Sequence, residues 1–157
     1  MKARELLASR VLRAPVTDLY RILVEPAEQL RWNSLYLEAV VDPPGEIRSG
    51  SALRGRFKGS GSASVTFVDV VKDRHFTHHT VMTFPYTAIT LGRFEHTYSV
   101  QESGGGTLVT QHLRFAPSGL GRLMAPVIMR SFRRRLPTSF DELQAYAENQ
   151  GRYDSRG

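Results

Sequence analysis

Residues 104–150 read GGGTLVTQHLRFAPSGLGRLMAPVIMRSFRRRLPTSFDELQAYAENQ, and this stretch decides the fold. It begins with the glycine turn Gly104–Gly106, continues as a strand over Leu108–Phe115, and ends in a long amphipathic segment, Gly119–Gln150. A helix with one apolar stripe must bury that stripe, and here the preceding sheet is the available partner. A cavity can remain between the sheet and the helix. This layout favours a pocket for a small molecule or lipid.

The apolar stripe of the long segment has helical periodicity. Pro126 and Pro137 lie inside the segment, and the stripe keeps its phase across Pro137, which predicts one kinked helix rather than two unrelated ones. Arg130 and Arg134 fall far from the stripe, which predicts a solvated face for them. The members of the stripe follow one another at steps of three and four residues: Ala125, Met129, Phe132, Leu136, Phe140, Leu143 and Ala147.

The hairpin before this helix has a predictable register. If Ser103–Gly106 forms the loop, Glu95 lies opposite Arg114 on one face, an opposite-charge pair that contributes a fraction of a kcal/mol. A shift by one residue would place the apolar side chains in water. The other face then carries the opposed pairs Phe94 and Phe115, His96 and Leu113, Tyr98 and Gln111, and Val100 and Val109.

The rest of the chain is predicted to be mostly strands. A helix follows Pro15, is interrupted at Pro26, and resumes over Ala27–Trp32. Leu35, Leu37, Ala39 and Val41 alternate and are expected on one face. Strands joined by tight turns predict an antiparallel sheet of about seven strands in an α+β fold. The six strands before the last one are predicted over Arg4–Arg13, Leu35–Val41, Leu53–Lys58, Ser64–Val71, His75–Thr83 and Ala88–Gln101.

Length and composition favour one globular domain. The 157 residues are 41% hydrophobic and 23% charged, and the chain has no cysteine, which excludes disulfides and thiolate metal sites. We expect a single domain over residues 1–150 and a loose tail over 151–157. The first residues lack the apolar run of a signal peptide, so a cytoplasmic protein is expected.

The net charge of +6 is concentrated in an arginine cluster. Arg130, Arg133, Arg134 and Arg135 could contact phosphates or an anionic membrane surface, or they could form an ordinary solvated helix face. No basic platform with interleaved aromatic residues is present, so nucleic acid is not an expected partner. The histidines show no metal-ligand spacing, and neither a metal nor a cofactor is expected.

Several motifs, taken in order, resemble the START-like (SRPBCC, helix-grip) superfamily, particularly its bacterial polyketide cyclase/dehydrase and lipid-transport branch. They are the strand leading into Ala14-Pro15, Leu30-Arg31-Trp32-Asn33, and the final hairpin with Phe115-Ala116-Pro117. The resemblance covers roughly residues 4–150. It implies a β-α-α-β6-α order, with a curved sheet wrapped around the C-terminal helix and a cavity between them. Members bind lipids, quinones or polyketides, and a minority are enzymes. The resemblance carries over no catalytic set.

His96 is the histidine most suited to a site, because the register places it beside Tyr98 and Gln111 on the apolar face. These side chains could orient a ligand, could hydrogen-bond one another in an ordinary core, or could move a proton. His78 and His79 must point to opposite faces. A pair between Asp69 and His78 depends on which face of strand 64–71 points inward, and the turn patterns disagree on this.

We therefore predict a pocket that binds or transports an apolar small molecule such as a lipid, quinone or polyketide. The alternatives are a cyclase or dehydratase that uses His96 and Tyr98, and a protein- or membrane-interaction module that uses Arg130 and Arg134. The protein is expected to be a monomer or homodimer. The predicted ligand-binding residues are Trp32, Phe57, His78, Phe94, His96, Tyr98, Gln111, Leu113, Phe115, Met129, Phe132 and Leu136.

Overall fold

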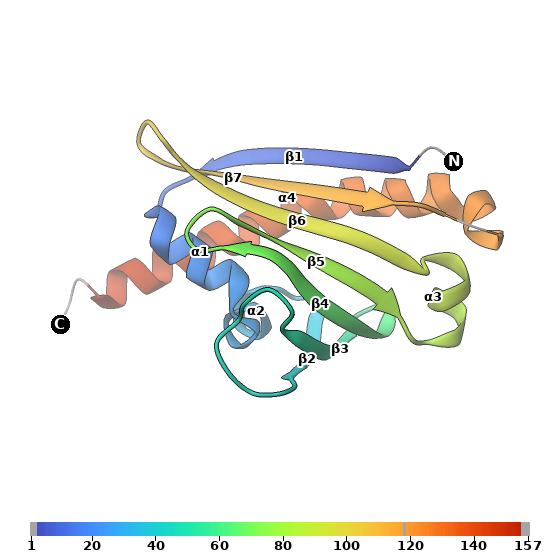
Figure 1. Ribbon diagram of the computed structural model, residues 1–157. Helices are drawn as coiled ribbons and strands as arrows, with labels where there is room; N and C mark the ends of the chain where they lie inside the picture. The colour runs from blue at the N-terminus through green and yellow to red at the C-terminus, as the bar shows by residue number, and fades with distance from the viewer. Residues whose placement is uncertain (1–2, 118, 155–157) are drawn as a thin grey trace.

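A computed structural model describes residues 3–117 and 119–154 of the chain. Seven strands form one antiparallel sheet in the spatial order β1-β7-β6-β5-β4-β3-β2 (Figure 1). Strand β1 is therefore at one edge of the sheet. Its only neighbour among the described strands is β7, the last strand in the chain. The strands are β1 (Arg4–Leu12), β2 (Tyr36–Val41), β3 (Ala52–Phe57), β4 (Gly61–Val71), β5 (His75–Met82), β6 (Arg93–Ser103) and β7 (Gly106–Phe115).

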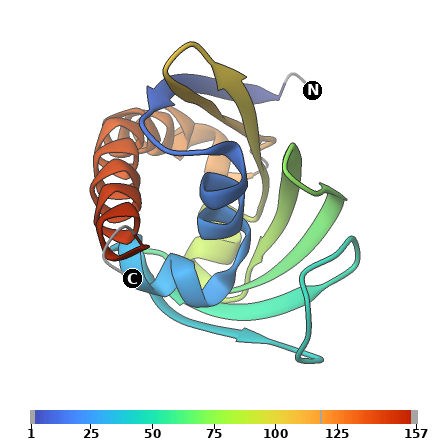
Figure 2. The ribbon, with the colours of Figure 1, turned by 90° about the vertical axis from the view of Figure 1, so that its left-hand side faces the viewer.

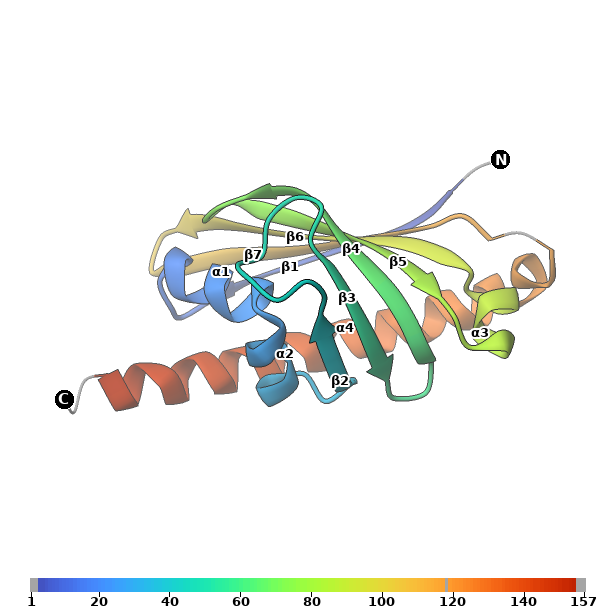
Figure 3. The same ribbon diagram turned by 60° about the horizontal axis from the view of Figure 1, so that its bottom comes forward.

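The helices lie on the concave side of the sheet. Figure 2 shows the sheet curving around the helices, with α4 (Leu120–Asp154) on its open side. The short helices α1 (Val16–Val24) and α2 (Pro26–Trp32) stand near the C-terminal half of α4 (Figures 1 and 3). The predicted α+β helix-grip fold is confirmed. None of the described helices is long and apolar enough to cross a bilayer.

The predicted hairpin register between β6 and β7 is confirmed. Phe94 lies opposite Phe115, and His96 lies opposite Leu113. On the outer face, Arg114 donates a hydrogen bond to Glu95 at 3.2 Å. Alternation of the buried face with this charged face leaves only one register that keeps the apolar residues out of water.

Helix α4 is one continuous helix that contains both Pro126 and Pro137. Each member of the predicted stripe from Ala125 to Ala147 is buried or half-buried. The helix ends at Asp154, so the predicted loose tail is wrong for residues 151–154, which continue the last helical turns. The remaining tail residues 155–157 lie outside the described residues.

One predicted strand begins too early. The segment Ala88–Gln101 is predicted to be a strand from its first residue, but α3 (Pro85–Thr90) occupies its start and β6 begins at Arg93. Proline at the first helical position has a backbone angle already suited to a helix. Gly92, with φ of 58°, ends the helix by donating to the Thr87 carbonyl at 3.0 Å. The helix adds an element to the β-α-α-β6-α order.

The inward face of β4 is fixed by its pairing with β3. Leu53 pairs with Val65, and Ala63, Val65 and Phe67 are buried. The Asp69–His78 pair, which the sequence left open, does not form, because His78 lies opposite Phe67. The register shifts between Val68 and Val71, where Asp69 has a φ of 50°, and Asp69 instead contacts the His75 ring at 3.0 Å.

A second irregularity changes the face of β2. The register between β2 and β3 shifts between Tyr36 and Glu38, as a bulge does. Leu37, expected to share a buried face with Leu35, is consequently 46% exposed. Tyr36 is half-buried, and its ring meets the Phe57 ring edge-on at 4.8 Å. The predicted face of strand 35–41 is therefore wrong at its start.

Buried apolar side chains form two clusters along α4. The larger cluster joins Phe140, Leu143 and Ala147 of α4 to α1, α2 and the middle of the sheet. The smaller one joins Ala125 and Met129 of α4 to residues of β1 and β7: Leu6, Leu113 and Phe115. A cavity lies beside both clusters, next to Phe132, Leu136 and Ser139 of α4.

Candidate functional site

A cavity of about 140 Å³ lies between the inner face of the sheet and α4. Its apolar wall includes Phe57, Val65, Met82, Phe94 and Phe132. The volume is below the several hundred Å³ of most ligand pockets, so the space suits a small molecule. The remaining lining residues are Asn33, Leu35, Tyr36, Lys58, Ser60, His78, Thr80, Leu91, His96, Tyr98, Gln111, Leu113, Arg135, Leu136 and Ser139.

Two histidines stand side by side in this wall. His78 of β5 pairs with His96 of β6, so both side chains point to the same face of the sheet. The His96 ring stacks on the Tyr98 ring at 4.2 Å, and the His78 ring meets the Phe67 ring edge-on at 4.6 Å. The neighbouring His79 points outward and contacts Glu95 at 3.3 Å. The prediction that His78 and His79 occupy opposite faces is confirmed.

Burial keeps the inward histidines neutral. It lowers the pKa of His78 to about 3, and a charge on His96 would lower it further. Burial also lowers the pKa of His96 to about 4, although the Gln111 side chain acts in the opposite direction. Burial raises the pKa of Tyr98 well above its ordinary value. At neutral pH these three side chains are therefore uncharged, and each ring can still form hydrogen bonds.

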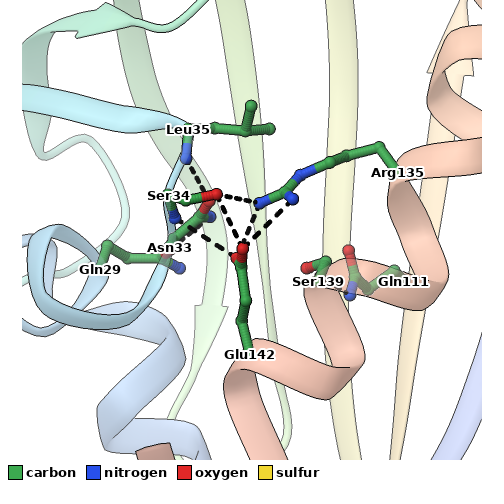
Figure 4. A network of polar contacts seen from close by, with 8 residues as sticks. All are labelled: Gln29, Asn33, Ser34, Leu35, Gln111, Arg135, Ser139 and Glu142. Carbon is green, nitrogen blue, oxygen red and sulfur yellow. Dashed lines mark hydrogen bonds and ion pairs between the residues drawn. The ribbon is translucent and has the colours of Figure 1, made fainter.

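The charged side of the cavity is a network between α4 and the segment after α2 (Figure 4). Arg135 donates to both carboxylate oxygens of Glu142, at 2.7 and 3.3 Å, and to the Ser34 hydroxyl at 2.9 Å. Ser34 in turn donates to Glu142 at 2.7 Å. Partial burial by itself would raise the pKa of Glu142, but the hydrogen bonds from Arg135 and Ser34 lower it. The carboxylate therefore balances the guanidinium.

The amide side chains next to this network are also held in place. Asn33 donates to Gln29 at 3.0 Å and accepts from the Leu35 backbone at 3.1 Å. Across the cavity, Gln111 donates to the Ser139 hydroxyl at 3.4 Å (Figure 4). These contacts orient the polar groups of the wall through the protein's own side chains.

Three buried side-chain nitrogens have no hydrogen-bond partner within the described part of the chain: His78 Nε2, His96 Nε2 and Arg135 Nε. All three belong to residues that line the cavity. Buried polar atoms are normally paired, because an unpaired one costs about 1–3 kcal/mol. A molecule in the cavity, whether water or a ligand, would supply the missing partners.

The structure places nine of the twelve predicted site residues in the cavity wall. The other three are packed elsewhere: Trp32 is buried and donates to the Ile22 carbonyl at 3.2 Å, while Phe115 and Met129 belong to the smaller core cluster. The nine lining residues are Phe57, His78, Phe94, His96, Tyr98, Gln111, Leu113, Phe132 and Leu136.

Sequence reasoning missed two prominent members of the wall. The sequence predicts an anion-binding or solvated role for the arginine cluster that includes Arg135, although Arg135 follows Phe132 by three residues and precedes Ser139 by four, which places all three on one side of the helix. That spacing was the available signal. Tyr36 carried no such signal, because the bulge in β2 turns it inward. Among the described residues, no cluster of histidines and carboxylates could hold a metal ion.

Comparisons with known proteins identify the relatives of this architecture. A family described as "Polyketide cyclase / dehydrase and lipid transport" matches residues 4–148. No curated protein sequence gives a significant match. Protein NE0264 from Nitrosomonas europaea has a similar crystal structure, with a TM-score of 0.72, 17% identity, and coverage of 95% of this chain and 97% of that one.

Two further solved structures carry functional names. A norcoclaurine synthase point mutant from Thalictrum flavum, in complex with a transition-state analogue, has a TM-score of 0.71 and 11% identity over 96% of this chain and 97% of its own. The di-domain ARO/CYC BexL, from the BE-7585A biosynthetic pathway, has a TM-score of 0.74 and 11% identity. This chain covers 50% of BexL, and BexL covers 93% of this chain. At such identities the likeness concerns the fold.

Proposed function

The chain belongs to the polyketide cyclase / dehydrase and lipid transport family, and from that premise we propose that it binds a small, uncharged, mainly apolar molecule in the cavity. The observation that carries this proposal is the set of three unpartnered nitrogens among the described residues, His78 Nε2, His96 Nε2 and Arg135 Nε, in a mainly apolar wall. A ligand with one or two hydrogen-bonding atoms on an apolar body would satisfy both properties of the wall.

The electrostatics of the wall favour a neutral ligand over an ion. The two histidines are uncharged because burial lowers the pKa of each. Arg135 is already neutralised by Glu142 at 2.7 Å. Lys58 also lines the cavity, but it is exposed to solvent. An anionic ligand would therefore lose its hydration without gaining a buried, unpaired positive charge, which costs far more than burying a phenol or a ketone.

Three aromatic probes of similar shape test this proposal: naphthalene, 2-naphthol and 2-naphthoate. We expect 2-naphthol to bind most tightly, naphthalene more weakly, and the carboxylate least, as measured by calorimetric titration. His78→Leu should weaken 2-naphthol binding about tenfold, the effect of one lost hydrogen bond, and should leave naphthalene binding nearly unchanged. His79→Leu is the matched control, since His79 lies next in sequence on the outer face.

Binding of 2-naphthoate in preference to the other probes would overturn the neutral-ligand proposal. Failure of all three probes to bind would count against any aromatic-sized ligand in this cavity. Equal loss of binding in His78→Leu and His79→Leu, with an unchanged melting temperature, would place the binding site elsewhere on the protein.

A cyclase or dehydratase that uses His96 and Tyr98 is the second candidate, supported by the family description and by the names of the two functional neighbours. The geometry supports it less. The rings of His96 and Tyr98 are stacked, and the pKa of His96, lowered to about 4, makes the imidazole a weak base at neutral pH. If the protein turned over a polyketide substrate, and both His96→Ala and Tyr98→Phe abolished that turnover, catalysis would become the favoured function.

A further inference from the structure

Exposed apolar side chains gather around α3 and the start of α4. Phe84, which precedes α3, is 52% exposed, and Leu123 of α4 is 77% exposed. Scattered exposed hydrophobic residues are normal, whereas a concentration of large ones marks a surface that binds something. The six exposed large hydrophobic residues of these two segments are Phe84, Tyr86, Ile89, Leu120, Leu123 and Val127.

The two segments adjoin in space. Helix α3 lies beside the first turns of α4 in Figures 1 and 3. Gly121 allows the close approach, because a Cβ atom at that position would lie 2.4 Å from the Thr90 carbonyl oxygen. The exposed apolar side chains therefore belong to one end of the molecule, which we call the α3–α4 end.

The outer surface of α4 changes from apolar to basic along one stripe. Leu120, Leu123, Val127, Arg130 and Arg134 follow one another at steps of three, four, three and four residues, and all five are exposed. Arg133 is exposed beside them. The exposed stripe, which lies opposite the buried one, is therefore apolar in its first half, with leucine and valine, and basic in its second half, with arginine.

These arginines have no acidic neighbours in the sequence. Neither aspartate nor glutamate occurs between residues 103 and 140. Within the described part of the chain, Arg130, Arg133 and Arg134 form no ion pair, whereas the inward-facing Arg135 is paired with Glu142. Three positive charges without a described counter-charge therefore lie next to the apolar residues.

We propose that the α3–α4 end docks on an anionic lipid surface. Leucine, isoleucine and aromatic side chains enter the boundary between headgroups and acyl chains, and arginines bind the phosphates, as in peripheral amphipathic helices. Each arginine near such a surface strengthens binding about fivefold, which corresponds to about 1 kcal/mol. The charge pattern selects this occupant, because an apolar partner protein or a second copy of this chain would leave the arginines without counter-charges.

The α3–α4 end lies next to the cavity. Leu91, directly after α3, lines the cavity, as do Phe94 and Phe132. Part of the cavity wall therefore lies next to the docked end. The docking itself does not depend on the cavity being occupied.

Sedimentation with lipid vesicles tests the proposal. We expect the protein to bind vesicles of phosphatidylcholine with phosphatidylglycerol, to bind vesicles of phosphatidylcholine alone far less, and to be released by salt. Leu123→Ser and Arg134→Gln should each weaken binding to the anionic vesicles, the arginine variant about fivefold. Leu7→Ser is the control for the leucine, because Leu7 is 69% exposed on β1. Arg48→Gln in the β2–β3 loop is the control for the arginine.

Two results would overturn the proposal. One is binding that is absent, or equal for neutral and anionic vesicles. The other is a dimer in size-exclusion chromatography that Leu123→Ser dissociates while vesicle binding is missing, which would assign the surface to a second copy of this chain. Melting temperatures of the variants show whether any loss comes from unfolding.

Discussion

The two halves of α4 bury the same kind of stripe with different results. The C-terminal half packs Phe140, Leu143 and Ala147 into the larger cluster, with α1 and α2 closing the space between helix and sheet. The N-terminal half contacts a much smaller cluster, borders the cavity and exposes Leu123 and Val127. Two short helices account for the difference, because they supply the apolar side chains that fill the space at one end. A stripe on a helix therefore specifies burial but not how completely the space beneath it is filled.

The largest predicted effect is a loss of folding stability in acid, caused by the two buried histidines of the cavity wall. An unfolded histidine has a pKa near 6.5, while burial lowers the pKa of His78 to about 3 and that of His96 to about 4. As the pH falls below 6.5, the unfolded chain binds protons that the folded chain does not, so stability is lost on acidification and is fully present above pH 6.5. By pH 5 the loss should reach about 2 kcal/mol for each histidine.

Urea unfolding at several pH values measures this effect. His96→Gln should remove about half of the pH dependence between pH 5 and 6.5, and His79→Gln on the outer face should remove little of it. A pH profile that is unchanged in His96→Gln would show that the buried histidine is not the group that titrates.

Leucine truncation compares the two regions directly. Leu143 is fully buried in the filled cluster, and Leu143→Ala should lower the free energy of unfolding by about 3 kcal/mol because it creates a new cavity. Leu136 is only half-buried, so Leu136→Ala removes less buried apolar surface and should cost only about 1 kcal/mol. The second variant should also admit larger aromatic probes, which calorimetric titration can detect. Equal losses in both variants would contradict the contrast between a filled and an open end.

The contact between α3 and α4 gives the smallest of these effects. Gly121→Ala would place a methyl group 2.4 Å from the Thr90 carbonyl oxygen, a clash that costs about 2 kcal/mol. Helix propensity opposes this loss with a gain of up to about 1 kcal/mol, so we expect a net destabilisation of about 1 kcal/mol. Gly151→Ala is the matched control in the same helix, because nothing lies within 4 Å of the position that its methyl group would occupy. Thermal unfolding of both variants decides which effect dominates, and a gain in both would show that α3 moves aside.

The inward set of the final hairpin could be predicted because its evidence is local. Apolar residues alternate on both strands, and the turn at Gly104 and Gly105 fixes their offset, so Phe94, His96, Tyr98 and Gln111 share one face. The stripe of α4 was predictable for the same reason, since the helical period is a property of neighbouring residues. The nine predicted residues that line the cavity come mostly from these two segments.

Other features depend on pairing between distant segments or on small departures from regular geometry. The bulge in β2 turns Tyr36 inward. At the irregularity in β4, Asp69 contacts His75 and not His78. Helix α3 has a recognisable sequence signal, because Pro85 stands at its start and Gly92 follows its end, whereas the bulge in β2 has none. An inserted residue reverses the faces of a strand without changing its composition, and so composition cannot reveal it.

By itself, the sequence determined the order of most elements, the register of the last hairpin and the stripe of the long helix, because each follows from periodicity over a few residues. Only the tertiary structure decided which side chains line the cavity and how large it is. Arg135 is the clearest example: its charge suggested solvent, but Glu142 and Ser34 hold it at the cavity wall. The cavity is the small space left unfilled after many side chains from distant segments have packed. No local sequence pattern specifies the volume of that space.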